Sequence, residues 1–337
     1  MTSLVSLLPN NAHALIVGGT AGIGAAIAHK LALALPPTSQ ITIAGRNATA
    51  AQRIIDGIRN DISTQGDTIA SAGATMNFAA VDCGKMSDVK RFCKDYRRNV
   101  LQEPTHKLDL LVLSPGILAM DGRQPASPGS TLDLKMSLHY YARMLIIREL
   151  LPCLAENATV LSVLDGKRSD ARAPGIKWDD MDLSHPGNYG VSKAAEHCLT
   201  FTDIQLQDFA EQSNKDTTSH GAPHRTFIHA YPGIVATELF NTPRLPWYVR
   251  LGAKGFAAVL AVSPETCAER LLHGVAECKE KDLAGGEAST VAASPKGLWN
   301  IDDKGKILTN KNRADRETVE KVREHTWHAV DSQPADA

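Results

Sequence analysis

The sequence is poor in aromatic residues and has almost no net charge. Its 337 residues contain 4 Trp, 6 Tyr and 7 Phe, and 36 Lys and Arg oppose 37 Asp and Glu, for a net charge of -1. Because nucleic-acid-binding proteins usually carry a basic patch or a high pI, this balance argues against a nucleic-acid partner. The 43% content of hydrophobic residues argues against disorder, since a chain of this length can bury roughly three quarters of its unfolded surface.

Cysteine is also scarce. The six cysteines form no C-x-x-C pair and no zinc-type spacing with the twelve His, so we expect no metal site and reduced thiols in a cytoplasmic protein. The apolar stretch at the N-terminus is short and lacks the basic residues of a signal peptide. The apolar segment 245–262 is interrupted by Arg250 and Lys254, so we expect no membrane span.

Strand-like and helix-like segments alternate along most of the chain. An apolar run at 14–17 ends in a glycine-rich turn and is followed by a helical pattern over 25–35. This alternation predicts an α/β fold with a Rossmann-type, doubly wound parallel sheet. Further strands are expected at 41–44, 75–81, 108–113, 160–164 and 226–231, and helices at about 48–63, 85–101, 131–151, 189–212, 242–260 and 264–278.

One domain accounts for this pattern better than two, because no linker rich in Pro, Gly or Ser separates independent halves. We expect a nucleotide-binding domain over 1–282, which includes a substrate loop at about 232–262. An extension over 283–337 is expected to pack on the same domain, with a strand at 297–302 and a charged helix near 314–330.

The first turn, from Gly18 to Gly24, suits a phosphate-rich ligand. Glycines let the backbone approach a pyrophosphate closely, and the N-terminus of the next helix presents unpaired N–H groups to the anion. A tight turn without a ligand is the alternative. At the end of the second strand stands Arg46 and no carboxylate, which favours the 2′-phosphate of NADP(H) over the 2′-hydroxyl of NAD. The alternative there is a solvated surface arginine.

The glycine spacing resembles the T-G-x-x-x-G-x-G motif of the classical short-chain dehydrogenase/reductase family, with Val17 in place of the Thr. Two further landmarks follow in the family's order. Tyr189-Gly-Val-Ser-Lys193 matches Y-x-x-S-K, and Pro232-Gly233 matches the P-G that follows the sixth strand. The resemblance covers residues 12–240, and the remainder looks like the extended tail of fungal members.

The resemblance implies a catalytic tyrosine and lysine. Tyr189 would protonate the substrate oxygen while a hydride arrives from the nicotinamide, and Lys193 would hold the nicotinamide ribose. Residues four apart on a helix project from one face, so we expect the ammonium of Lys193 to lower the pKa of Tyr189 from about 10. A surface Tyr/Lys pair is the alternative.

Three family positions depart from the pattern. The N-N-A-G strand reads Leu-Ser-Pro-Gly at 113–116, so the amides that tie this strand to its neighbours are missing. An ungapped alignment puts the family's serine on Asp165, and a shifted one makes Ser162 the residue that orients the substrate carbonyl; a strand serine bonded to backbone is the alternative. The family's relay Asn aligns with His139, whose imidazole titrates near neutrality and would pass a proton itself. A polar residue packed at a subunit interface is the alternative for His139.

The resemblance implies further cofactor contacts. Asp82 would face the adenine, with a helix N-cap as its alternative. Arg143 lies one turn after His139 and would touch the cofactor, and the Val235 backbone and Thr237 hydroxyl would meet the nicotinamide carboxamide and the pyrophosphate. The full cofactor set is Gly18, Gly22, Ile23, Gly24, Arg46, Asp82, Arg143, Tyr189, Lys193, Val235 and Thr237.

These landmarks predict an NADP-dependent oxidoreductase that acts on a carbonyl or secondary alcohol. The lost family residues leave a second hypothesis open, a catalytically silent NADP(H)-binding scaffold or sensor. The sequence also leaves a homo-oligomer open.

Apolar and aromatic residues outside the nucleotide half are expected to line the pocket of a hydrophobic small molecule, such as a polyketide, terpenoid or long-chain carbonyl. They are Trp178, Met181, Phe240, Leu245, Trp247 and Tyr248. The segment 245–262 is expected to form a lid, with a dimer contact or an interfacial membrane helix as alternatives. Trp299 and Trp327 are expected to pack the C-terminal extension.

Overall fold

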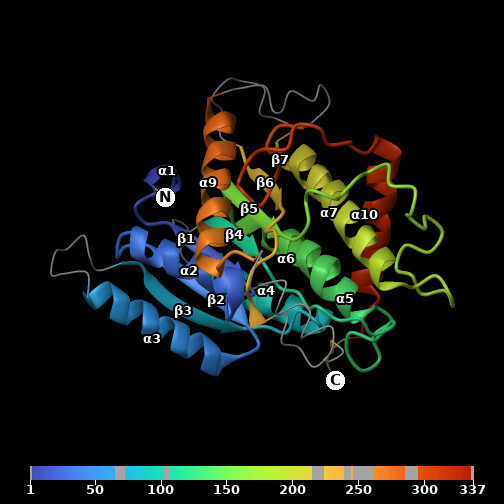
Figure 1. Cartoon of the computed structure of the whole chain (residues 1–337), viewed down its shortest axis with the longest axis horizontal. Coiled ribbons are helices and arrows are strands. Elements are labelled where there is room, and N and C mark those ends of the chain that lie inside the picture. The colour runs from blue at the N-terminus through green and yellow to red at the C-terminus, as the bar shows by residue number, and fades with distance from the viewer. Residues whose placement is uncertain are drawn as a thin grey trace.

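A computed structural model describes residues 2–64, 73–101, 107–214, 224–238, 244–245, 261–284 and 295–334. Its centre is one seven-stranded parallel sheet in the order β3-β2-β1-β4-β5-β6-β7 (Figure 1). The strands are β1 His13–Val17, β2 Gln40–Gly45, β3 Thr75–Ala80, β4 Leu108–Leu113, β5 Leu154–Val163, β6 Thr226–Ala230 and β7 Leu298–Ile301. This confirms the predicted Rossmann-type sheet, whose strand order reverses between β1 and β4.

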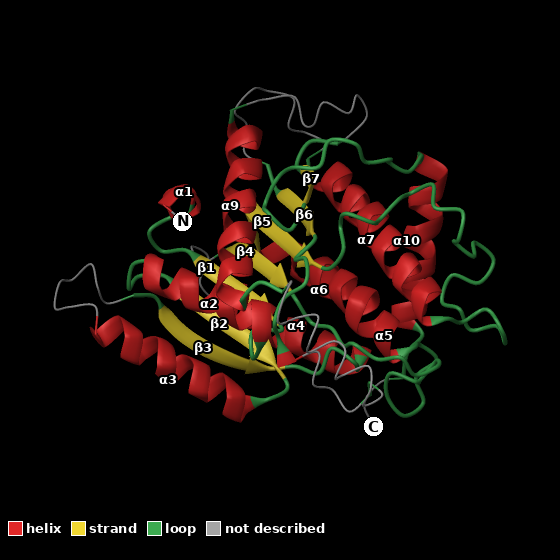
Figure 2. Ribbon diagram, in the orientation of Figure 1, coloured by secondary structure: helices red, strands yellow, loops and turns green. Residues whose placement is uncertain are grey.

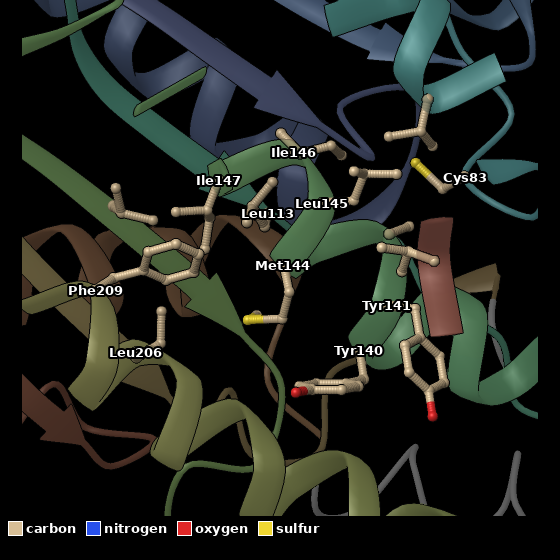
Figure 3. Packing of buried hydrophobic residues seen from close by; sticks show 14 of the residues in the cluster. Cys83, Leu113, Tyr140, Tyr141, Met144, Leu145, Ile146, Ile147, Leu206 and Phe209 are labelled. Atoms are coloured by element: carbon tan, nitrogen blue, oxygen red, sulfur yellow. The ribbon is translucent and has the colours of Figure 1, made fainter. Parts of the chain in front are cut away.

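Helices cover both faces of the sheet, which is why the central strands are almost wholly apolar and buried (Figure 2). One face packs against α1 Thr2–Leu7, α2 Gly22–Ala34, α3 Ala48–Thr64 and α9 Pro264–Leu283. The other packs against α4 Met86–Leu101, α6 Ala142–Leu150 and α7 Val191–Ser213, and α10 Arg316–Asp331 packs on α7. Figure 3 shows part of this second layer, with Ile147 of α6 beside Phe209 of α7.

The helix that follows β4 is irregular at its start. It runs through α5 Leu134–Met136, a π-helical turn at Ser137–Tyr141, and α6, and a short 3-10 turn at Leu151–Cys153 follows. Asp133 caps it, because one carboxylate oxygen accepts hydrogen bonds from the N–H groups of Lys135 and Met136. π-helical turns are rare and are frequent at functional sites.

The C-terminal segment is part of this architecture. The expected strand at 297–302 is confirmed as β7, which pairs in parallel with β6, and the expected helix is confirmed as α10. Trp299 is buried in β7, and Trp327 of α10 packs against Phe209, with ring centroids 6.1 Å apart. Both tryptophans pack the extension as predicted.

A buried carboxylate also joins this segment to the sheet. Asp203 of α7 accepts hydrogen bonds from His229 of β6 at 2.7 Å and from Asn300 of β7 at 2.8 Å, and Lys311 lies 3.5 Å from its second oxygen. Burial alone would raise the pKa of Asp203, but His229 and Lys311 hold it well below its usual range. The extension is therefore anchored by charge as well as by apolar packing.

Several boundaries differ from the expected ones. β5 begins at Leu154, six residues before the expected start, because its first part is polar and a register irregularity separates it from the regular pairing with β4. Helix α7 begins at Val191 because Gly190 has an extended backbone. Helix α1 was not expected, and the helix expected at 242–260 falls almost wholly outside the described residues.

The six cysteines are all unpaired and buried, in agreement with the expected reduced thiols. Within the described ranges, no helix combines the length and apolarity needed to cross a membrane.

Candidate functional site

A groove of about 290 Å³ lies at the carboxyl ends of β1, β2, β3 and β4. This is the edge of a doubly wound sheet where ligands bind, at the point where the strand order reverses. Five residues of the predicted cofactor set line it: Gly18, Gly22, Ile23, Arg46 and Thr237. The other lining residues are Thr20, Ala21, Gly45, Val81, Cys83, Ser114, Pro115, Gly116, Leu138 and Glu238.

The glycines of the first turn allow three separate close approaches. Gly18 has a φ of +84°, and a Cβ there would lie 2.7 Å from the carbonyl carbon of Ser114. A Cβ on Gly24 would lie 2.4 Å from the Gly18 oxygen, and one on Gly22 would lie 3.1 Å from the Thr237 side chain. Since real Cβ atoms do not come within 3.0 Å of backbone, the turn can close on itself and on β4 only without side chains.

The start of α2 faces this groove. The helix begins at Gly22, and its N-cap, Ala21, offers no side chain to its first N–H groups. Unpaired N–H groups at the positive end of a helix dipole bind anions. Arg46 stands on the rim, exposed, and makes no hydrogen bond or ion pair with the described residues. The groove therefore offers two sites for negative charge.

Arg143 does not line the groove. Its side chain is 1% exposed, and its guanidinium donates to the carbonyl oxygens of Leu113 and Val163 at 3.2 and 2.8 Å and of Pro115 at 2.6 Å. It also donates to the Ser162 hydroxyl at 3.0 Å and to the Leu138 carbonyl. The structure thus places Arg143 beneath the groove, joining the ends of β4 and β5.

Ser162 is wholly buried in β5, where Arg143 donates to its hydroxyl. Ser162 is therefore neither a groove residue that orients a substrate carbonyl nor a strand serine bonded to backbone. It lines no part of the groove, and its partner is a side chain. The alternative position, Asp165, is turned to Arg168, with 2.8 Å between its carboxylate and Nε. The sequence showed neither pairing because both depend on contacts across the fold or within a loop.

His139 is held in the π-helical turn against the loop after β4. Its Nε2 accepts a hydrogen bond from the Ile117 N–H at 3.2 Å, and this nitrogen lies against Gly116. Removal of the ring from water and the positive charge of Arg143 lower its pKa to about 3. The expectation that His139 titrates near neutrality is therefore wrong, and the ring is a neutral acceptor that fixes the groove wall.

Tyr189 and Lys193 do not lie on one face of a helix as expected, because α7 begins only at Val191. The Tyr189 ring instead lies under the ammonium of Lys135, 5.6 Å from the ring centroid. Its hydroxyl is buried and has no hydrogen-bond partner among the described residues. Burial, followed by the negative charge of Asp133, raises the pKa of Tyr189 above its usual range, so the expected lowering is wrong.

Tyr189 is not among the residues that line the groove. Its neighbour Lys135 lies about one turn before Leu138 on the helix after β4, and Leu138 does line the groove. Lys193 is half-buried in the first turn of α7 and is not among the groove-lining residues.

Two other predicted cofactor residues lie beside the groove. Asp82 accepts a hydrogen bond from the N–H of Gly84 at 2.9 Å, which is a turn within the loop and not the helix cap considered as its alternative. Val235 is buried, and the backbone on either side of it pairs with Val262. Thr237, two residues later, reaches the groove.

The residues expected to line a substrate pocket fall into two groups. Trp178 packs against Phe201 of α7, with ring centroids 6.0 Å apart, and Met181 is buried in the same core cluster, so neither lines the groove. Their place at a substrate pocket stays a prediction, because an apolar loop residue can face either the core or a ligand and most of the expected substrate loop lies outside the described residues. Leu245 is buried. Phe240, Trp247 and Tyr248, with nearly all of the lid segment, lie outside the described residues.

Sequence reasoning missed several groove residues that carry no motif. Cys83 and Leu138 contribute apolar wall, and Glu238 contributes a carboxylate next to Thr237. Only their place in the sequence indicated a groove residue, since Cys83 and Ser114 lie at or just after the ends of predicted strands.

No protein-family model matches the chain. It is similar to the oxidoreductase AN1596 of Emericella nidulans, with 30% identity over 234 residues, which are 68% of this chain and 60% of the relative. It is also similar to the short-chain dehydrogenase/reductase SAT2 of Stachybotrys chartarum, with 26% identity over 66% of this chain and 60% of the relative. The chain thus matches less than two thirds of the length of these relatives.

Solved structures share the fold. The angucycline C-6 ketoreductase LanV with bound NADP aligns with a TM-score of 0.54 and 20% identity, over 87% of this chain and 94% of that one. A short-chain dehydrogenase/reductase from Serratia marcescens BCRC 10948 aligns with a TM-score of 0.53 and 16% identity, over 87% and 97%. At these identities the likeness establishes the parallel, helix-covered sheet.

The glycine turn gives the first testable prediction. Gly18→Ala is expected to lower the free energy of unfolding by more than about 1 kcal/mol, because the new Cβ meets the backbone of β4 and the φ is positive. Gly57→Ala is the control, since a Cβ there meets nothing within 4 Å and alanine favours a helix by up to about 1 kcal/mol. Urea unfolding measures both, and a Gly18→Ala protein as stable as Gly57→Ala would contradict this geometry.

The low pKa of His139 gives the second testable prediction. Below about pH 6.5 the unfolded chain takes up a proton on this ring that the folded protein excludes, so stability falls with pH. The wild type should therefore lose up to about 1.4 kcal/mol per pH unit more than His139→Gln between about pH 6 and pH 4. Urea unfolding across this range provides the measurement, with exposed His328→Gln as control. Parallel pH profiles for wild type and His139→Gln would refute the buried neutral ring.

Proposed function

This chain belongs to the short-chain dehydrogenase/reductase family, and we propose that it transfers a hydride between NADP(H) and a carbonyl or secondary alcohol of a hydrophobic small molecule. The observation that carries the proposal is the groove at the carboxyl edge of the sheet, with its glycine-rich turn and, on its rim, Arg46, which makes no ion pair with the described residues. Six buried, unpaired cysteines favour a reducing compartment such as the cytoplasm.

The residues of the groove fit a dinucleotide that carries a 2′-phosphate. The turn around Gly18 and the uncapped start of α2 would hold the pyrophosphate, and Thr237 lies directly across from Gly22 to close the site. Arg46 follows β2, where an arginine accommodates the 2′-phosphate. NADP(H), when bound, supplies or accepts the hydride.

Tyr189 is the proton donor in this proposal. Its raised pKa keeps the hydroxyl protonated at neutral pH, which is the form that donates to a substrate oxygen. The hydroxyl is buried without a partner in the described part of the chain, and a substrate oxygen would satisfy it. Lys193, in the first turn of α7, keeps its predicted role at the nicotinamide ribose.

Orientation of the substrate carbonyl cannot come from Ser162, whose hydroxyl is buried and engaged by Arg143. Neutral His139 and its hydrogen bond to Ile117 hold the groove wall, so we assign it a positioning role in place of proton relay.

The alternative of a silent NADP(H)-binding scaffold is weaker. It rests on three departures from the family pattern: the missing amides of the N-N-A-G strand, the missing serine and the missing relay Asn. In this chain Arg143 donates hydrogen bonds to the carbonyl oxygens of Leu113, Pro115 and Val163, at the ends of β4 and β5. The relatives named as oxidoreductases favour the active enzyme.

Cofactor preference tests the role of Arg46. Arg46→Ala should weaken NADPH binding about tenfold, because hydrogen bonds to charged groups contribute about 1.5–3 kcal/mol, and should leave NADH binding nearly unchanged. Fluorescence titration with both nucleotides measures this, with exposed Arg53→Ala on α3 as the matched control. Equal loss for NADPH and NADH would remove Arg46 from the 2′-phosphate site. A wild type that binds neither nucleotide would overturn the proposal.

Turnover tests Tyr189. Tyr189→Phe should reduce NADPH consumption with a panel of hydrophobic ketones by roughly 10²–10⁴-fold, as expected for loss of a general acid, and leave the NADPH Kd unchanged. Tyr231→Phe removes a hydroxyl from a half-buried ring elsewhere and should retain activity. Unchanged turnover in Tyr189→Phe, beside measurable binding, would favour the scaffold.

A further inference from the structure

Arg143 is a buried cation without a carboxylate partner. No Asp or Glu of the described residues lies within 4.0 Å of its guanidinium, and its five hydrogen bonds go to four carbonyl oxygens and one hydroxyl. Burial lowers its pKa only to about 10, so it stays charged at neutral pH. A buried unpaired charge is costly, and such a group is retained where its charge has a use.

The hydrogen bonds of Arg143 connect it to the groove wall. It binds the carbonyl of Pro115, and Pro115, with Ser114, is the backbone that Gly18 approaches most closely. It also binds the carbonyl of Leu138, another residue that lines the groove, and its contacts with Ser162 and Val163 fix both to the end of β5. One planar guanidinium therefore sets the position of Pro115, against which the glycine turn packs, relative to Leu138.

The charge of Arg143 also reaches the groove. Cys83 lines the groove, and burial, followed by the Asp82 carboxylate, raises the pKa of its thiol to about 12 against the opposing charges of Arg143 and Arg46. The same guanidinium disfavours a proton on His139. Positive potential from beneath the wall thus adds to that of Arg46 on the rim and of the start of α2.

We propose that Arg143 is a positioning residue that fixes the wall of the nucleotide groove through the Pro115 and Leu138 carbonyls, and that its uncompensated charge favours the anionic cofactor. The proposal rests on the function proposed above and differs from the sequence-based expectation, because Arg143 acts without touching the cofactor. In this chain, which lacks the family's amides, a single cation binds the carbonyl oxygens at the ends of β4 and β5 and adds positive charge beneath the groove.

Two substitutions separate geometry from charge. Arg143→Lys keeps the charge and loses the planar set of donors, whereas Arg143→Gln keeps some hydrogen bonding and loses the charge. Arg148→Gln is the matched control, since Arg148 lies on the same helix and forms an ion pair with Asp331 at the surface. The NADPH Kd of each folded protein, at two salt concentrations, is the readout.

Both Arg143 variants should bind NADPH about tenfold more weakly or worse, as expected for loss of charged hydrogen bonds, and Arg148→Gln should bind as the wild type does. The Kd of Arg143→Gln should depend less on salt than that of the wild type, and Arg143→Lys should keep the wild-type dependence. A merely structural arginine would not produce this difference between the two variants.

Three results decide the proposal. Wild-type affinity in Arg143→Gln would overturn it, as would equal salt dependence in the wild type and both variants. If Arg143→Gln does not fold, Arg143→Lys decides: an unchanged Kd would show that the planar ties are dispensable. A wild type that fails to bind NADPH at all would instead overturn the proposed function. That outcome is recognised because the titration of the wild-type protein itself shows no binding signal.

Discussion

The structure depends on a close approach of two backbones at the carboxyl edge of the sheet. The turn after β1 can lie against the end of β4 because Gly18 has no side chain, and β4 can hold its place there because Arg143 binds carbonyl oxygens on both β4 and β5. Without the glycine the turn would clash with β4, and without the guanidinium several buried carbonyls would lose their partners. The nucleotide groove is the space that these two constraints leave open.

The second half of the chain packs on the helices and strands that carry this edge of the sheet. Helix α10 packs on the helices after β4 and β5, where Tyr140 and Thr326 share a hydrogen bond of 2.5 Å. Asp203 joins α7 to β6 and β7 through buried polar contacts. The residues that complete the sheet are thus contributed after position 283, and the aromatic residues of this half mainly pack helices together.

The sequence predicted the strands well because apolar runs followed by glycine or polar turns are local features, as in 14–17 followed by Gly18. It predicted the groove turn and Arg46 for the same reason. It did not predict the start of α7, since Gly190 interrupts a pattern that otherwise continues through Tyr189. It also could not show that Trp178 and Met181 pack against the core, because hydropathy does not distinguish a core contact from a ligand contact.

The ionisation states were the least predictable property. His139 and Tyr189 both depart from their usual pKa values, and in each case the main cause is burial, followed by a charge from another residue: Arg143 for His139, and Asp133 for Tyr189. The sequence by itself determined the class of fold, the glycine-rich turn and the arginine at the rim, since each follows from short runs of neighbouring residues. Only the tertiary structure decided that Arg143 lies beneath the groove and that Ser162 is buried away from it. Burial and long-range hydrogen bonds are properties of the folded chain, and no local spacing encodes them.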